Sequence, residues 1–161
     1  MGDEKGSLLK DLAKLIPGYG TYVEQESRRN DDRLVRDFVC ERLSDCKSKM
    51  IKIGQAALES GDLDAPTKTE KVREELDRAQ SRLKSAVEGY AGWFGHREVN
   101  AELLKEICDL DSNLVSLVDQ ADALGQSAME GGEANWGELK EIVERLHGRI
   151  DRREQLLKSG N

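Results

Sequence analysis

The fold class follows from residues 110–128, which read LDSNLVSLVDQADALGQSA. Apolar residues recur there at alternating steps of four and three, at Leu110, Leu114, Leu117, Ala121, Leu124 and Ala128. Steps that average about 3.5 residues keep one stripe of an α-helix turned toward a neighbouring helix. The same spacing occurs upstream, at Val72, Leu76, Ala79, Leu83, Ala86, Tyr90 and Trp93. The sequence therefore predicts helices that pack on helices along coiled-coil-like seams.

Capping residues and glycines indicate where the helices begin and end. Three pairs fit the capping box, in which a side chain at the helix start accepts an amide proton while an acidic residue reaches back. They are Thr21 with Glu24, Thr67 with Glu70 and, more weakly, Asn135 with Glu138. Helix-ending glycines occur at Gly61, Gly95, Gly131 and Gly132. We expect long helices near residues 21–60, 67–95, 99–130 and 135–158, after a short helix near residues 7–16.

The predicted helix at 99–130 carries a second apolar row, formed by Leu104, Cys108, Val115 and Val118. Two rows predict two helical neighbours. The short connection between Gly95 and Glu98 predicts that this helix packs antiparallel to the one before it. The resulting prediction is an all-α, antiparallel bundle of about four long helices with a short N-terminal amphipathic helix. Residues 1–20 form the short helix and turn, and residues 21–161 form the bundle, within one domain.

Composition excludes several classes of function. Charged residues make up 35% of the 161-residue chain and aromatic residues only 4%, which is typical of long solvated helices. The net charge of −7 repels nucleic-acid phosphates, so we expect no nucleic-acid partner. The three cysteines lack a C-x-x-C spacing and fall at apolar helix positions, as reduced cysteines do. With neither an apolar run of roughly 20 residues nor the positive start of a signal peptide, the sequence predicts a cytoplasmic protein.

Glu144 and His147 form an E-x-x-H pair, which places a carboxylate and an imidazole on one helix face, as in di-iron bundles. Such bundles need a second pair and two further glutamates, whereas the only other histidine of the chain is His96. The sequence also contains no catalytic triad, phosphate loop or zinc spacing. We therefore expect no enzyme, no catalytic residues, no metal and no cofactor. A metal- or cofactor-binding bundle that uses this pair is an alternative.

Five apolar residues line one face of the predicted N-terminal helix: Leu8, Leu9, Leu12, Leu15 and Ile16. Pro17 and Gly18 end this helix. A helix so short is marginal by itself, so its apolar face must dock on something. Three receivers remain open: the bundle itself, a protein partner or second subunit, and a membrane surface.

Tyr90, Trp93 and Phe94 are interleaved with glycines at positions 89, 92 and 95. They either cap one end of the core at a helix terminus or form a contact surface, because tryptophan and tyrosine are enriched at binding hot spots. Together with the five apolar residues of the N-terminal helix, they make up the candidate interaction surface.

The opening of the chain resembles that of small uncharacterised bacterial helical-bundle proteins. The resemblance lies in Ile16, Pro17, Gly18 and Tyr19, followed by Glu24, Glu26, Arg28, Arg29, Asp32 and Arg36. These residues give a short amphipathic helix, a Pro-Gly-Tyr turn and a long charged helix. The resemblance implies a bacterial cytosolic bundle and no particular site residues.

These features together predict a non-catalytic interaction or scaffold protein, an adaptor that acts through helix–helix contacts. We expect a protein partner or self-association. A peripheral membrane adaptor that uses the N-terminal amphipathic helix is the first alternative, and the metal- or cofactor-binding bundle is the second.

Overall fold

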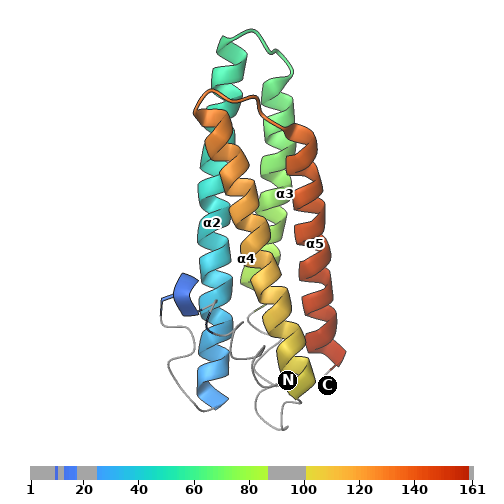
Figure 1. Ribbon diagram of the computed structural model, residues 1–161. Coiled ribbons are helices and arrows are strands. Elements are labelled where there is room, and N and C mark those ends of the chain that lie inside the picture. The colour runs from blue at the N-terminus through green and yellow to red at the C-terminus, as the bar shows by residue number, and fades with distance from the viewer. Residues whose placement is uncertain (1–9, 11–12, 18–24, 87–100, 160–161) are drawn as a thin grey trace.

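The computed structural model describes residues 10, 13–17, 25–86 and 101–159 (Figure 1). Four long helices form the bundle: α2 (Gln25–Glu59), α3 (Ala65–Ser85), α4 (Ala101–Met129) and α5 (Trp136–Ser159). Lys10 and residues 13–15 are also helical, within the range expected for the short N-terminal helix. No described residue lies in a β-strand. The predicted all-α bundle is therefore confirmed, and none of its described helices is both long and apolar enough to cross a membrane.

The helices alternate in direction, so that α2 and α3 form one antiparallel hairpin and α4 and α5 form another (Figure 1). The two hairpins pack side by side, with α2 against α4 and α3 against α5. Within each of these cross-hairpin pairs the helices point the same way (Figure 1). We expected α4 to pack directly on the helix that precedes it, and this was wrong. The apolar rows of α4 face α2 and α5, which leaves α3 diagonally across the bundle.

The loops after α2 and α4 are both closed by Schellman turns. Gly61 has a φ of +99°, and the N–H of Asp62 donates to the carbonyl of Ala57 at 2.9 Å. Gly131 has a φ of +98°, and the N–H of Gly132 donates to the carbonyl of Ser127 at 3.0 Å. A positive φ is easily adopted by glycine and strained for other residues, which is why the helices end at these positions. Both predicted helix ends are confirmed, whereas the one at Gly95 lies outside the described residues.

The start of α5 agrees with the sequence prediction, whereas the start of α3 differs from it. Asn135 caps α5, because its Oδ1 accepts the backbone N–H of Glu138 at 3.1 Å while its Nδ2 donates to the Glu138 carboxylate at 2.9 Å. The capping box expected at Thr67 was wrong, since α3 already begins at Ala65. Pro66 lies in the first turn of α3, where its fixed φ favours the start of a helix. The capping box predicted at Thr21 falls outside the described residues.

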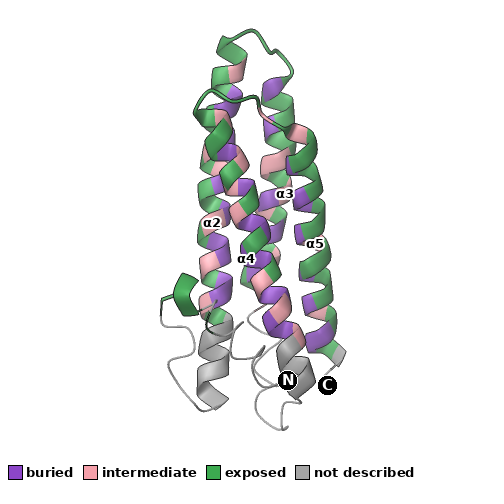
Figure 2. Cartoon of the chain, in the orientation of Figure 1, coloured by how far each residue is buried: buried purple, intermediate pink, exposed green. Residues whose placement is uncertain are grey.

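The core lies along the predicted seams (Figure 2). In α4, the buried residues of the main row are Leu110, Leu114, Leu117 and Ala121, and those of the second row are Cys108, Val115 and Val118. Leu124 and Ala128 of the main row are half-buried against the core. The facing stripe of α2 supplies Val39, Leu43, Cys46, Met50 and Ile53, and that of α3 supplies Leu76, Ala79 and Leu83. Ile16, from the N-terminal segment, is buried in the same cluster. The N-terminal segment therefore contributes to the core of the bundle.

Buried hydrogen bonds fix how α2 and α3 pack. The Gln80 amide nitrogen donates to the Cys40 carbonyl and to the Ser44 hydroxyl, both at 2.7 Å. Arg36 is buried and donates to the Leu83 carbonyl at 3.3 Å.

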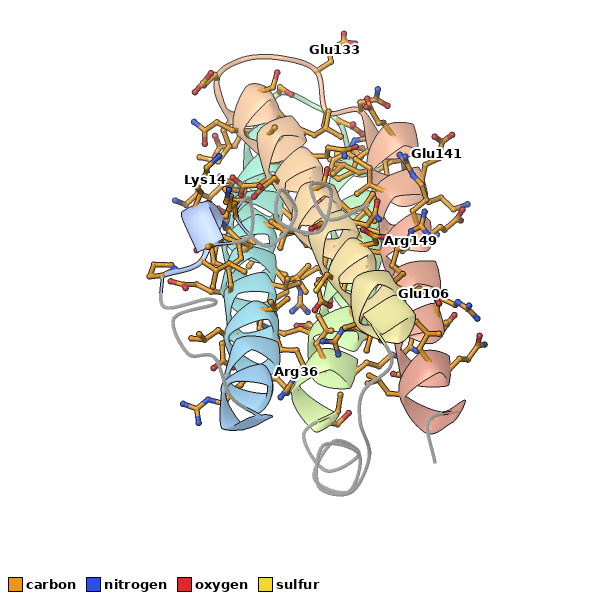
Figure 3. The ribbon with its side chains drawn as sticks, turned by 60° about the horizontal axis from the view of Figure 1, so that its bottom comes forward. Lys14, Arg36, Glu106, Glu133, Glu141 and Arg149 are labelled. Carbon is orange, nitrogen blue, oxygen red and sulfur yellow. The ribbon has the colours of Figure 1, made fainter. Side chains whose placement is uncertain are left out.

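Charged side chains elsewhere, including Glu133, Glu141 and Arg149, extend into solvent from the outside of the bundle (Figure 3).

Near its C-terminal end, α2 comes so close to α3 that only glycine fits. A Cβ built on Gly54 would lie 2.6 Å from the Thr69 hydroxyl oxygen, well inside van der Waals contact. Thr69 is buried, and its hydroxyl donates to the Ala65 carbonyl at 2.7 Å. The absence of a side chain at Gly54 therefore sets the separation of the two helices here.

Candidate interaction groove

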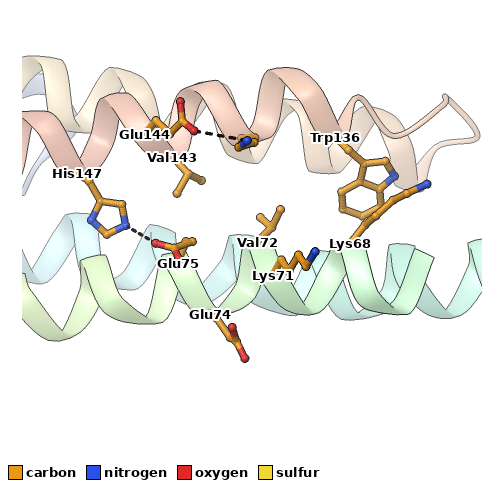
Figure 4. Close-up of a pocket in the computed structure, with 10 residues that line it drawn as sticks. Lys68, Lys71, Val72, Glu74, Glu75, Trp136, Val143, Glu144 and His147 are labelled. Carbon is orange, nitrogen blue, oxygen red and sulfur yellow. Dashed lines mark ion pairs between the residues drawn. The ribbon is translucent and has the colours of Figure 1, made fainter. Parts of the chain in front are cut away.

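A groove of about 570 Å³ runs between the parallel helices α3 and α5 (Figure 4). Its volume is in the range of about 300–1,000 Å³ that is usual for ligand sites. We divide the groove along the helices into a lysine end, an apolar floor and a glutamate end. Because α3 and α5 point the same way, residues early in both helices line the first part and residues late in both line the last.

The lysine end consists of Lys68 and Lys71 on α3 and Trp136 and Lys140 on α5. Trp136 is the first residue of α5, and the Asn135 cap fixes where that helix begins. The indole is half-buried and packs against the core cluster. The N-terminus of α5 adds the positive end of its helix dipole to the three ammonium groups. This end of the groove is therefore cationic and contains an aromatic surface.

The apolar floor is formed by Val72 from α3 and Val143 from α5. Val143 belongs to the core cluster, and Val72 is half-buried against it. The floor is thus continuous with the interior of the bundle.

The glutamate end contains Glu74 and Glu75 on α3 and Glu144 and His147 on α5. The Nε2 atom of His147 lies 3.1 Å from Oε2 of Glu75, within ion-pair distance (Figure 4). This buried nitrogen has no hydrogen-bond partner among the described residues. Glu75 also accepts a hydrogen bond from Arg78 at 2.7 Å. This end is acidic and also contains one imidazole.

The E-x-x-H pair does not converge on a common point. Glu144 lies 3.8 Å from Lys140, one turn earlier in α5, whereas His147 faces Glu75 on the other helix. Within the described ranges, no group of three or more His, Cys, Asp and Glu side chains is arranged to hold a metal ion. The geometry of these residues favours charge recognition over metal binding.

The cysteines are placed for packing. Cys40, Cys46 and Cys108 are all buried, and they form no disulfide with one another. Burial, together with the charge and hydrogen bond of Asp122, raises the pKa of Cys46 to about 12. Burial likewise raises the pKa of Cys40. A thiol with so high a pKa stays protonated at neutral pH and is a poor nucleophile.

The candidate interaction surface from the sequence is only partly covered by the structure. Ile16 is 2% exposed and lies in the core, whereas Leu15 is 49% exposed. Leu8, Leu9, Leu12, Tyr90, Trp93 and Phe94 lie outside the described residues. The groove residues were not singled out as a set by the sequence, because their proximity depends on α3 and α5 being neighbours. A signal was nevertheless present, since lysine, valine and glutamate follow in that order on both helices.

No family model, curated protein or solved structure matches the chain.

Proposed function

We propose that the protein is a non-catalytic interaction protein that binds a helical segment of a partner protein in the groove between α3 and α5. The observation that carries this proposal is the make-up of the groove: an apolar floor with an indole at one end, between two charged helix faces. Amphipathic helices bind such grooves by laying their apolar face on the floor while their polar face stays in water. Trp136 is the expected anchor, because tryptophan is enriched at binding hot spots.

The N-terminal helix gives less support to the alternative of a membrane adaptor. Of the described residues on its apolar face, Ile16 is buried in the bundle and only Leu15 is exposed. A membrane-binding helix needs its whole apolar face free to enter the lipid boundary. A cytoplasmic location and a bacterial origin remain predictions from the sequence.

Site-specific photo-crosslinking in the native cell tests the proposal. Lys71, in the groove, and Lys52, on α2, are both exposed and form no ion pair with another described residue. Each is replaced in turn by benzoylphenylalanine, and crosslinked products are identified by mass spectrometry. We expect the probe at position 71 to capture a protein through a helical segment and the probe at position 52 to give no such product. Equal capture at both positions, or none from the groove, would contradict the proposal.

A further inference from the structure

We infer that the groove selects a partner helix whose charges are segregated, with acidic residues at the end that meets Trp136 and basic residues at the end that meets His147. This inference rests on the proposed function and adds the chemistry and direction of the bound helix. It follows from the order of charges along the groove.

The charges in the groove are sorted by the parallel packing of α3 and α5. On α3, Lys68 and Lys71 precede Val72, and Glu74 and Glu75 follow it. In an antiparallel pair, this order would place lysines opposite glutamates, and the groove would be neutral along its length. In the parallel pair seen here, lysines of one helix lie level with lysines of the other, and glutamates lie level with glutamates.

The second wall of the groove repeats the order. On α5, Lys140 precedes Val143, and Glu144 follows it. Along the two helices, the three lysines therefore come before the valines and the three glutamates come after them, while the side chains of Lys140 and Glu144 approach each other to 3.8 Å. Opposite charges presented at the two ends of one groove can read the direction of a bound helix.

Several of these charges are not neutralised within the bundle. Lys71 and Glu74 form no ion pair with any residue in the described part of the chain. The ion pairs of Lys68 with Asp62 and of Lys140 with Glu144 are loose, at 3.8 Å each. These four side chains are available to a partner, because an exposed ion pair at this distance contributes little to stability and is broken at little cost.

Tighter ion pairs occur next to the groove, on the same helix. Arg73 lies 2.6 Å from Glu70 and 3.1 Å from Asp77. Charges beside the groove are thus paired with one another, whereas among the lysines and glutamates that line it only Glu75 is tightly paired, with Arg78 at 2.7 Å. This contrast favours an outside partner for the lysine and glutamate ends.

The partner that fits is an amphipathic helix of about three turns, since a turn holds 3.6 residues and the groove covers residues 136–147 of α5. Apolar side chains at spacings of three and four residues would cover Val72, Val143 and Trp136. Aspartate or glutamate one turn to one side would meet the lysine end, and lysine or arginine one turn to the other side would meet the glutamate end.

A displayed library of helical peptides tests the inference. The peptides carry fixed leucines at helical spacing, and the charged positions on both sides are randomised. Selection on the full-length protein should enrich peptides with acids at one end and bases at the other. Benzophenone attached to the acidic end should crosslink near Trp136, and benzophenone at the basic end should crosslink near His147.

Charge reversal supplies the matched control. The double variant Lys71→Glu with Lys140→Glu should bind the selected peptide about fivefold more weakly, because two modest pairs become repulsive. Lys52→Glu with Lys84→Glu makes the same change in net charge at exposed positions away from the groove, and it should leave the affinity unchanged.

The outcomes separate the inference from the proposed function. If no peptide is enriched, or if enriched peptides crosslink elsewhere, groove binding itself is wrong. If peptides bind in the groove but carry no charge order, or crosslink in both directions, the inference fails while groove binding stands. Equal weakening by both double variants would also overturn it, since the effect would then be one of net charge.

Discussion

Gly54 and Gly148 are both helical, but their surroundings differ. A Cβ at Gly54 would collide with buried Thr69, whereas nothing lies within 4 Å of a Cβ at Gly148. Alanine at position 54 must therefore push α2 and α3 apart. Alanine at position 148 meets only solvent and restricts the unfolded chain.

We predict opposite effects of alanine at these two positions. Gly54→Ala should lower the free energy of unfolding by about 1–3 kcal/mol through overpacking. Gly148→Ala should raise it by about 0.5–1 kcal/mol, the usual preference of a helix interior for alanine. Urea unfolding followed by circular dichroism measures both, and Thr69→Ala should restore part of the loss at position 54. A gain in stability from both substitutions would show that the two helices do not approach closely.

The raised pKa of Cys46 makes a prediction about alkaline stability. The ordinary value is 9.0 and the folded value is about 12, so the folded state holds the thiol proton more tightly than the unfolded state does. The stability gained from this difference is complete below pH 9 and is lost as the pH rises toward 12.

The free energy of unfolding should thus fall above pH 9 more steeply in wild type than in Cys46→Ala, which has no thiol to ionise at this position. Urea titrations at pH 8, 9 and 10 measure the difference between the two proteins, which should narrow as the pH rises. Parallel curves would mean that the Cys46 thiol ionises as easily in the folded state as in the unfolded state.

At the scale of the elements, α4 and α5 are joined by two arginine–carboxylate pairs that differ in burial. Asp111 and Arg153 are only 3% and 2% exposed, and Arg153 Nε donates to Asp111 Oδ1 at 2.6 Å. Glu106 and Arg152 also meet at 2.6 Å, but in solvent. Their comparison isolates the effect of burial on a charge pair.

We predict that Asp111→Ala lowers the free energy of unfolding by about 3–5 kcal/mol, because it leaves a buried guanidinium without its carboxylate. Glu106→Ala should change it by less than about 1 kcal/mol. Replacing Asp111 and Arg153 together by leucine should recover part of the loss. Thermal and urea melts measure all three variants, and equal effects of the two alanine substitutions would show that the inner pair is solvated.

The elements also show how far the sequence could lead. The seams at Leu76 and Leu114 and the cap at Asn135 were predictable, because each depends on a local pattern. The burial of Asp111 was not, since its partner lies on another helix. The groove was beyond prediction for the same reason: the order of lysine, valine and glutamate gains meaning only when α3 and α5 are known to be parallel neighbours.

At the scale of the whole molecule, the N-terminal segment is tied to the bundle through Ile16. The neighbouring residue Leu15 is 49% exposed, against 2% for Ile16. The sequence left open whether this segment packs on the bundle, on a partner or on a membrane. The burial of Ile16 supports the first of these for this residue.

We therefore predict that Ile16→Ala lowers the free energy of unfolding by about 2–5 kcal/mol, the usual cost of truncating a buried isoleucine. Leu15→Ala should change it by less than about 0.5 kcal/mol. Both are measured by urea unfolding of the full chain. If Ile16→Ala changes the stability as little as Leu15→Ala, the segment detaches in solution, and a protein partner or a membrane surface again becomes the expected receiver of the N-terminal helix.

The pairing of two hairpins side by side has a consequence for how the chain folds. Each hairpin is closed by a short loop, so its helices meet at a small cost in loop-closure entropy. Contacts between hairpins, such as that of Cys46 with Val118, join residues 72 positions apart and form at a larger cost. During synthesis the first hairpin is complete before α4 has been made, because domains and their parts emerge N-terminal end first. The late step is then the docking of the α2–α3 hairpin on the α4–α5 hairpin. Its rate should respond more to substitutions at the interface between the hairpins than to substitutions within either one.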